Sequence, residues 1–360
     1  MIEILQVIWF LCLLVILLYH LFVFNLKGNH PTYIPSTSLP GVSVIMAVQN
    51  STEQLRKNLY NIIHQNHPIF EVIIVDDHSH PLDRKDLEEV VQFLPQVKLL
   101  ASGATGKKHA LMTGFKNAKY DFVLCTDADC TPASRDWIRT MMKHSGDHGV
   151  VIGYSPYLKS PGLLNLLIRF ETVMTGIQYL SWAVMGKPYM GVGRNILYPR
   201  SLVIAADPFS KHQEIPYGDD DLGLQALSGK SLIRVCMEKK AHVISTPASS
   251  WSQWLKQKHR HLSAGHYYKP DLWWQPGMYG LALIGHWFLL LFMIDSLTWW
   301  KWIPVFAVGL LISWISYFRW TLQLGDKDTA SLYPLLEITY AVYLAVMGSV
   351  TTLAKKKTWN

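Results

Sequence analysis

Two pairs of carboxylates come directly after short apolar runs, where side chains at the edge of a sheet could do chemistry together. The run FEVIIV leads into Asp76 and Asp77, and the run FVLCT leads into Asp127 and Asp129. Carboxylate oxygens are hard ligands, so Asp127 and Asp129 could hold Mg²⁺ or Mn²⁺ beside a diphosphate. One such pair is weak evidence, because aspartate is also common in turns and helix caps. Two pairs at the ends of two strands are stronger evidence for a site.

Alternating strands and helices are needed to position these carboxylates. Short apolar runs typical of strands occupy residues 42–47, 70–75, 97–100 and 122–126. Amphipathic runs typical of helices lie between them, at 53–65, 84–93 and 107–117. Apolar strands separated by helices indicate a parallel sheet that is covered on both faces and binds ligands beyond the carboxyl ends of its strands. We therefore expect an α/β domain over residues 40–270, with both acidic pairs at one crevice.

Apolar segments at both ends indicate that this domain belongs to a membrane protein. Only 16% of the 360 residues are charged, against about 25% in soluble domains, which excludes a disordered chain or an ordinary cytosolic enzyme. Apolar runs long enough to cross a hydrocarbon core occupy residues 4–24, 278–294, 302–318 and 332–353. We expect three parts: an N-terminal transmembrane anchor at 1–27, the middle domain at 40–270 and a C-terminal transmembrane region at 275–354.

The first apolar run has the features of a retained anchor. Only Glu3 precedes it, whereas a cleaved signal peptide would have lysine or arginine there. Lys27 on the downstream side favours a cytoplasmic middle domain, at the inner membrane of a bacterium. Leu163–Val184 has few charges and is predicted to be an amphipathic interfacial helix. The net charge of +7 suits anionic partners, nucleotide phosphates or anionic lipids; we do not expect nucleic acid to be a partner.

Several segments of the middle domain resemble, in order and spacing, the family 2 glycosyltransferases. These segments are VSVIMAVQN, EVIIVDDHS, GKKHALMTGF, FVLCTDADC and IPYGDDDLGLQAL, while WLKQKHRH resembles the QxxRW motif of the membrane-bound members. Each motif alone is modest evidence, but their shared order is specific. The resemblance implies a GT-A fold, which is a Rossmann-like, mostly parallel sheet with helices on both faces. One N-terminal and about three C-terminal transmembrane helices would flank it.

The resemblance also implies that the donor is a nucleoside-diphosphate sugar, most simply a UDP-sugar. The end of the first strand, Ala47 and Val48, would touch the nucleoside. Asp77 would contact its uracil or ribose, and Asp76 would support the same loop. Lys107 matches a family lysine that faces the diphosphate. Lys108, by contrast, fits a solvated first turn of a helix.

A divalent metal and a general base are the remaining catalytic parts that the resemblance implies. Asp127 and Asp129 match the metal-binding DxD motif, and the metal would stabilise the departing nucleoside diphosphate. The base falls on Asp219 or Asp220, and we favour Asp220 because Gly218 and Asp219 then fill the first two motif positions. Neighbouring acids should raise the pKa of this base, which would take the proton of an acceptor hydroxyl. An acidic helix N-terminus is the alternative interpretation.

The acceptor side is implied by two further matches. Gln257, Arg260 and His261 occupy the QxxRW positions, so Arg260 would reach the diphosphate and Gln257 would hold the acceptor. His261 replaces the tryptophan that usually stacks on the acceptor in this family. Gly193 and Asn195 resemble the family's acceptor-side Gly-x-Asn loop.

The resemblance therefore implies an inverting glycosyltransferase whose acceptor is a lipid, a lipid-linked sugar or a growing glycan at the membrane. A processive polysaccharide synthase is the alternative in the same class: the QxxRH residues favour it, but about four membrane segments are few for a translocation channel. A sugar-phosphate nucleotidyltransferase would share the sheet and the acidic ligands. That enzyme would need a glycine-rich basic loop after the first strand, and AVQNSTEQL is not one.

Overall fold

The computed structural model describes residues 2–25, 39–146, 148–215, 217–293 and 299–353, which divide into two compact units. Unit 1 comprises Met1–Asn29, Lys159–Met185 and Ala248–Asn360, and unit 2 comprises His30–Leu158 and Gly186–Pro247. Two segments of the expected middle domain, 159–185 and 248–270, thus belong to unit 1 with the apolar ends of the chain. Lys27, which suggested the orientation of the anchor, lies outside the described residues.

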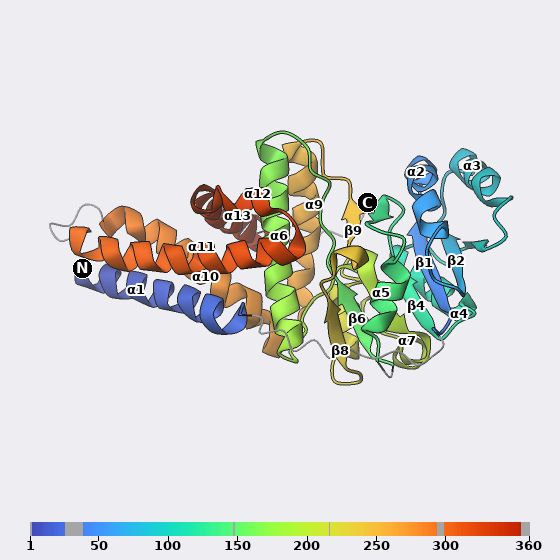
Figure 1. Ribbon diagram of the computed structural model, residues 1–360, viewed down its shortest axis with the longest axis horizontal. Helices are drawn as coiled ribbons and strands as arrows, with labels where there is room; N and C mark the ends of the chain where they lie inside the picture. The colour runs from blue at the N-terminus through green and yellow to red at the C-terminus, as the bar shows by residue number, and fades with distance from the viewer. Residues whose placement is uncertain (1, 26–38, 147, 216, 294–298, 354–360) are drawn as a thin grey trace. The chain divides into compact units, whose positions relative to one another are not determined.

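Unit 2 is built on a seven-stranded sheet, visible in the right half of Figure 1. The strands follow the order β3-β2-β1-β4-β7-β6-β8. They are β1 Val42–Val48, β2 Phe70–Asp76, β3 Val97–Ala101, β4 Phe122–Cys125, β6 Val150–Gly153, β7 Ile196–Pro199 and β8 Ile233–Cys236. All neighbours pair in parallel except β7, which is antiparallel to β4 and β6. A small second sheet pairs β5 Cys130–Pro132 with β9 Val243–Ser245. The expected mostly parallel sheet is confirmed.

Helices cover both faces of this sheet. Successive side chains of a strand point to opposite faces, so the apolar residues of one strand can pack against helices on both sides. The helices are α2 Thr52–Ile63, α3 Pro81–Val91, α4 Lys107–Asn117, α5 Trp137–Lys143, α7 Arg200–Ala206 and α8 Asp221–Leu227. Val44 and Met46 of β1 belong to one buried cluster with side chains of α2, α3 and α5. Ile45, on the opposite face, lies so close to Gly114 of α4 that a Cβ there would be 2.6 Å from its Cγ2. This close approach fixes α4 against the sheet.

Unit 1 is helical. Its elements are α1 Ile2–Leu18, the π-helical segment η1 Tyr19–Val23, α6 Leu163–Val184, α9 Trp251–Ser263, α10 Pro270–Met293, η6 Trp299–Trp302, α11 Ile303–Leu324, α12 Lys327–Ala330 and α13 Tyr333–Leu353. Among the described residues, three helices are long and apolar enough to span a membrane, at Glu3–Val23, Trp300–Leu324 and Tyr333–Val350. They correspond to the expected anchor and to two of the three expected C-terminal segments. The other expected segment, 278–294, falls mostly within α10, which is not one of the three.

Helix α6 is less amphipathic than the sequence suggested. Most of its residues are buried within the structure, including its two charged side chains, Arg169 and Glu171. Arg169 binds Asp326 and Asp328 with N–O distances of 2.7 and 2.9 Å, and Glu171 forms an ion pair with Lys258. The charges of α6 therefore join elements of unit 1 instead of forming a solvated face.

Candidate functional site

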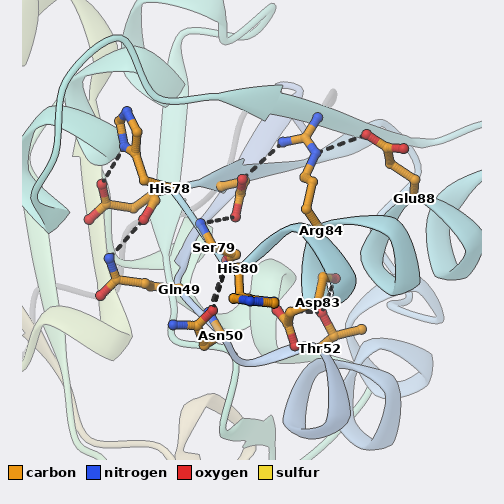
Figure 2. Close-up of polar contacts among 11 residues, drawn as sticks. Gln49, Asn50, Thr52, His78, Ser79, His80, Asp83, Arg84 and Glu88 are labelled. Carbon is orange, nitrogen blue, oxygen red and sulfur yellow. Dashed lines mark hydrogen bonds and ion pairs between the residues drawn. The ribbon is translucent and has the colours of Figure 1, made fainter.

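The loops that follow β1 and β2 are joined by hydrogen bonds, as Figure 2 shows. The Nε2 of Gln49 donates to the carbonyl oxygen of Asp77 at 2.8 Å. The N–H of Asn50 donates to Ser79 Oγ at 2.9 Å, and its Oδ1 accepts from the N–H of His80 at 2.8 Å. Asn50 has a φ of 49°, in the left-handed region that asparagine adopts more readily than most residues. The two strand ends are therefore held together by side chains of the first loop.

The two aspartates that follow β2 have different partners. Asp76 pairs with Arg84 Nη1 at 3.1 Å and accepts the N–H of Ser79 at 3.3 Å, so it ties its loop to α3. Asp77 accepts the N–H of Gly106 with both carboxylate oxygens, at 2.8 and 2.9 Å. Asp77 therefore joins the end of β2 to the start of α4.

The end of β1, predicted to touch a nucleoside, is hydrogen-bonded to Asp77. The carbonyl oxygen of Val48 accepts the N–H of Asp77 at 2.8 Å. The side chain of Val48 is buried, whereas Ala47 is partly exposed. Of the two, Ala47 is the residue with surface available to a ligand.

The start of α4 brings together the second acidic pair, Asp127 and Asp129, and a third acidic cluster, Asp219–Asp221. Gly106 caps the helix with a φ of 117°, a conformation that favours glycine. The next residue, Lys107, places its Nζ 3.0 Å from Asp127 Oδ1 and 3.2 Å from Asp219 Oδ2. Burial lowers the pKa of Lys107, but Asp127, Asp219 and Asp220 outweigh this effect and the pKa lies well above its usual value. Burial raises the pKa of Asp127, but Lys107 outweighs it and the net pKa is lowered.

Lys108 is not the solvated lysine that the sequence suggested. Its side chain is buried, and Nζ donates to the carbonyl oxygens of His212 at 2.6 Å and Ile215 at 2.9 Å. Burial lowers the pKa of Lys108, an effect that the nearby carboxylates Asp219 and Asp220 oppose. The sequence could not reveal this role, because the carbonyl partners come from a segment about 100 residues away in the chain. The two consecutive lysines thus have different roles. Lys107 contacts carboxylates, whereas Lys108 binds the segment that precedes the third acidic cluster.

The third acidic cluster contains one carboxylate that is suited to act as a base. Burial and the neighbouring Asp219 raise the pKa of Asp220 to about 6. Asp220 accepts N–H hydrogen bonds from Gly193 at 3.2 Å and from Asp221 at 3.0 Å, and it also caps α8. Asp219, in contrast, is ion-paired with Lys107, whose Nζ lies 3.2 Å from its Oδ2. The geometry therefore favours Asp220 as the base, although it serves as a helix cap as well.

Asn195, predicted on the acceptor side, is fully buried in the fold. Its Nδ2 donates to the carbonyl oxygens of Tyr154 at 3.0 Å and Ala241 at 2.9 Å. Its Oδ1 accepts from Trp137 Nε1 at 3.0 Å. Asn195 thus positions its loop, and Gly193 of the same loop reaches the third acidic cluster through its N–H. A role of this loop on the acceptor side stays a prediction.

Arg194 is a site residue that the sequence reasoning missed. Its guanidinium lies over the ring of Tyr157, 5.1 Å from the centroid, and Nη2 donates to the carbonyl oxygen of Ser155 at 3.2 Å. Burial lowers the pKa of Arg194, but neighbours that include Tyr157, Asp127 and Asp129 outweigh it and raise the pKa. Its Nε is buried without a hydrogen-bond partner among the described residues. The spacing of residues along the chain gave no signal that Arg194 lies near Asp127 and Asp129.

The expected metal ligands lie close enough together to share an ion. Asp127, Asp129 and Cys130 can each offer one atom, and these atoms lie within 4.8 Å of one another. Cys130 is buried and donates from Sγ to Asp129 Oδ1 at 3.2 Å, while burial raises the pKa of its thiol well above the usual value. The two carboxylates fit a hard divalent ion such as Mg²⁺ or Mn²⁺, with Cys130 orienting Asp129.

The QxxRW-like residues belong to the other compact unit. Gln257, Arg260 and His261 lie on α9 of unit 1, where Arg260 and His261 are exposed and Gln257 is partly exposed. Their contribution to an acceptor site stays a prediction.

The part of the chain that carries the first two acidic pairs is similar to known sequences. Residues 43–180 match the sequence model described as Glycosyl transferase family 2. The chain is 28% identical over 138 residues to Poly-beta-1,6-N-acetyl-D-glucosamine synthase of Staphylococcus aureus, which covers 38% of this chain and 32% of that protein. It is 22% identical over 196 residues to an uncharacterized glycosyltransferase of Haemophilus influenzae, covering 50% and 58%. The chain spans about a third of the length of the Staphylococcus aureus relative that it matches.

A solved structure extends the similarity to nearly the whole chain. The mannosyltransferase PcManGT from Pyrobaculum calidifontis, in complex with GDP-Man and Mn²⁺, superposes with a TM-score of 0.62 at 18% identity. The superposition covers 93% of this chain and 99% of that chain. This likeness, together with the sheet order, confirms the expected GT-A type of fold.

Proposed function

We propose that this chain, whose residues 43–180 form a glycosyl transferase family 2 domain, is a membrane-associated glycosyltransferase that uses a nucleoside-diphosphate sugar. The observation that carries the proposal is the junction at Lys107. This lysine contacts Asp127 and Asp219, while the residue before it binds Asp77. Three acidic clusters, each from a different part of the chain, thereby converge on the start of α4. The three apolar helices support the association with a membrane.

The charges of the site suit an anionic donor. Lys107 and Arg194 are cations beside the carboxylates, and either can contact a diphosphate. Asp77 and the end of β1 would hold the nucleoside. Asp127 and Asp129 would hold Mg²⁺ or Mn²⁺, which would screen the phosphate charge. The GDP-Man and Mn²⁺ bound by the Pyrobaculum calidifontis protein support this assignment of donor and metal.

Asp220 would act on the acceptor. It would take the proton of the acceptor hydroxyl as the oxygen of that hydroxyl attacks the anomeric carbon. The bond from the anomeric carbon to the phosphate oxygen would break, and the nucleoside diphosphate would leave. One positioned base would support a single displacement, and hence inversion at the anomeric carbon.

The acceptor would be a lipid, a lipid-linked sugar or a growing glycan, held in part by Gln257, Arg260 and His261. We place unit 2 on the cytoplasmic side of a bacterial inner membrane, where nucleotide-sugars are made. A processive polysaccharide synthase is the second candidate, because the Staphylococcus aureus relative carries a synthase name.

A transfer assay tests the proposal directly. The full chain, purified in detergent, is incubated with Mn²⁺, a membrane lipid extract and UDP-sugars or GDP-mannose labelled in the sugar. We expect release of nucleoside diphosphate and transfer of label to lipid or glycan, with product size separating single transfer from polymer synthesis. Release of pyrophosphate from a nucleoside triphosphate and a sugar phosphate, without any sugar transfer, would point to a nucleotidyltransferase and reject the proposal.

The raised pKa of Asp220 predicts the pH dependence of transfer. A base works only when deprotonated, and with a pKa of about 6 its ionised fraction rises as pH increases through 6. We therefore expect kcat/KM to fall about tenfold for each pH unit below that value and to level off above pH 7. Because Asp219 is close, the measured pKa belongs to the pair. A profile measured from pH 5 to 8 that stays flat would remove Asp220 from the role of base.

A further inference from the structure

Helices α1 and α11 of unit 1 lie side by side and run in the same direction (Figure 1). Near their beginnings the rings of Trp9 and Trp302 meet edge to face, with centroids 6.0 Å apart. Near their ends Trp320 Nε1 donates to the carbonyl oxygen of Phe24 at 2.8 Å. Both helices coincide with candidate membrane spans, so these ends would lie at the same membrane surface.

A cavity of about 420 Å³ opens between the two helices at these ends. One of its walls is η1, the π-helical segment Tyr19–Val23, and such segments often occur at functional sites. The lining contains both apolar and polar side chains. The apolar part includes Leu21, Ile312 and Ile315, and the polar part includes Asn25, Arg319 and Gln323.

Arg319 carries a charge that no carboxylate of the described residues neutralises. It is exposed, lies within the candidate span Trp300–Leu324, and forms no ion pair among the described residues. The acids just beyond this helix, Asp326 and Asp328, are both engaged by Arg169. A charged side chain in a membrane helix is costly unless it is paired or reaches the interface. Arg319 is exposed near the end of α11, so it can reach the interface, where an anionic headgroup can pair with it.

We propose that this cavity binds an anionic phospholipid, with its phosphate on Arg319 and one acyl chain along the apolar wall. A guanidinium can donate two parallel hydrogen bonds to phosphate oxygens. The volume of about 420 Å³ lies in the range of about 300–1,000 Å³ that is usual for small-ligand sites. Basic pockets between membrane helices are recognised sites for anionic headgroups. The proposal rests on membrane insertion, one part of the proposed function, but not on sugar transfer.

Thermal unfolding of the full chain in detergent, followed by tryptophan fluorescence, tests this site. Phosphatidylglycerol is added in one arm, phosphatidylcholine in a second, and glycerol phosphate in a third. A ligand that binds only the folded state raises Tm, so we expect phosphatidylglycerol alone to raise it by about 2 °C or more. Arg319→Gln should lose this shift. Lys301→Gln, which removes a cation near the other end of α11, should keep it.

A second variant keeps the test independent of the charge. Ser316→Trp fills the cavity while leaving Arg319 in place, and it should also abolish the shift. The proposal is overturned if Arg319→Gln or Ser316→Trp keeps the full shift, or if phosphatidylcholine or glycerol phosphate stabilises the protein equally. Since the measurement needs no substrate, its failure would leave the transferase proposal untouched, and an inactive protein could still show the lipid site.

Discussion

Replacing Asp220 by asparagine is expected to lower kcat about 100-fold or more while nucleotide affinity stays near that of the unmodified protein. Asparagine keeps the shape of the side chain and can still accept the N–H of Gly193 or Asp221. It cannot take a proton from an acceptor hydroxyl. A base acts in the chemical step and does not hold the donor, so the loss should appear in kcat. Nucleotide titration of the purified variant, paired with the transfer assay, measures both quantities.

Two matched variants separate the base from its neighbours. Asp219→Asn removes the partner of Lys107, so we expect a smaller loss of kcat than for Asp220→Asn. Asp77→Asn removes the charge that binds the N–H of Gly106, and should weaken nucleotide binding about tenfold before it affects kcat. If Asp219→Asn is the inactive variant and Asp220→Asn works, the base is Asp219. If both are active, this cluster is only a helix cap.

The sequence predicts the sheet and its acidic edge closely, because both depend on local patterns. Strand patterns at 42–47 and 70–75 correspond to β1 Val42–Val48 and β2 Phe70–Asp76, and the helix predicted at 107–117 is α4. Apolar runs between helices have few structural alternatives when the strands are parallel. Carboxylates at the ends of such strands must share one edge of the sheet. Asp77 binds the N–H of Gly106 and Asp127 pairs with Lys107, so the two pairs meet at the start of α4, in agreement with the expected convergence.

What the sequence could not predict depends on partners that are distant along the chain. Lys107 and Lys108 look alike in a sequence, yet one faces carboxylates and the other donates to backbone carbonyls of the segment 212–215. Asn195 matched an acceptor-side motif, but its side-chain amide forms its hydrogen bonds with residues inside the fold. Helix α6 was expected to be amphipathic, but its buried Arg169 pairs with the partly buried Asp326 and the exposed Asp328. Each outcome was decided by tertiary packing.

Removing a carboxylate of the DxD pair should have an effect as large as removing the base. We expect Asp127→Ala or Asp129→Ala to lower transfer about 10²–10³-fold, because the charge that stabilises the leaving diphosphate is then held poorly. EDTA should inhibit the unmodified protein, and added Mn²⁺ or Mg²⁺ should restore activity. The matched control is Asp121→Ala, an exposed acid just before β4, at its opposite end, which should change nothing.

The loss of Asp127 and the loss of Asp129 should also differ in their effect on nucleotide affinity. Asp127 is paired with Lys107, so its removal leaves the lysine with Asp219 as its one ion-pair partner among the described residues, and Lys107 can then partly replace the lost charge at the diphosphate. Asp129 is exposed, accepts from Cys130 Sγ and forms no ion pair among the described residues, so its loss releases no directly paired cation. Nucleotide affinity measured without metal should therefore rise or stay constant in Asp127→Ala and stay constant in Asp129→Ala, while transfer falls in both. Full activity of both variants, or of the unmodified protein in EDTA, would show that these carboxylates hold no catalytic metal.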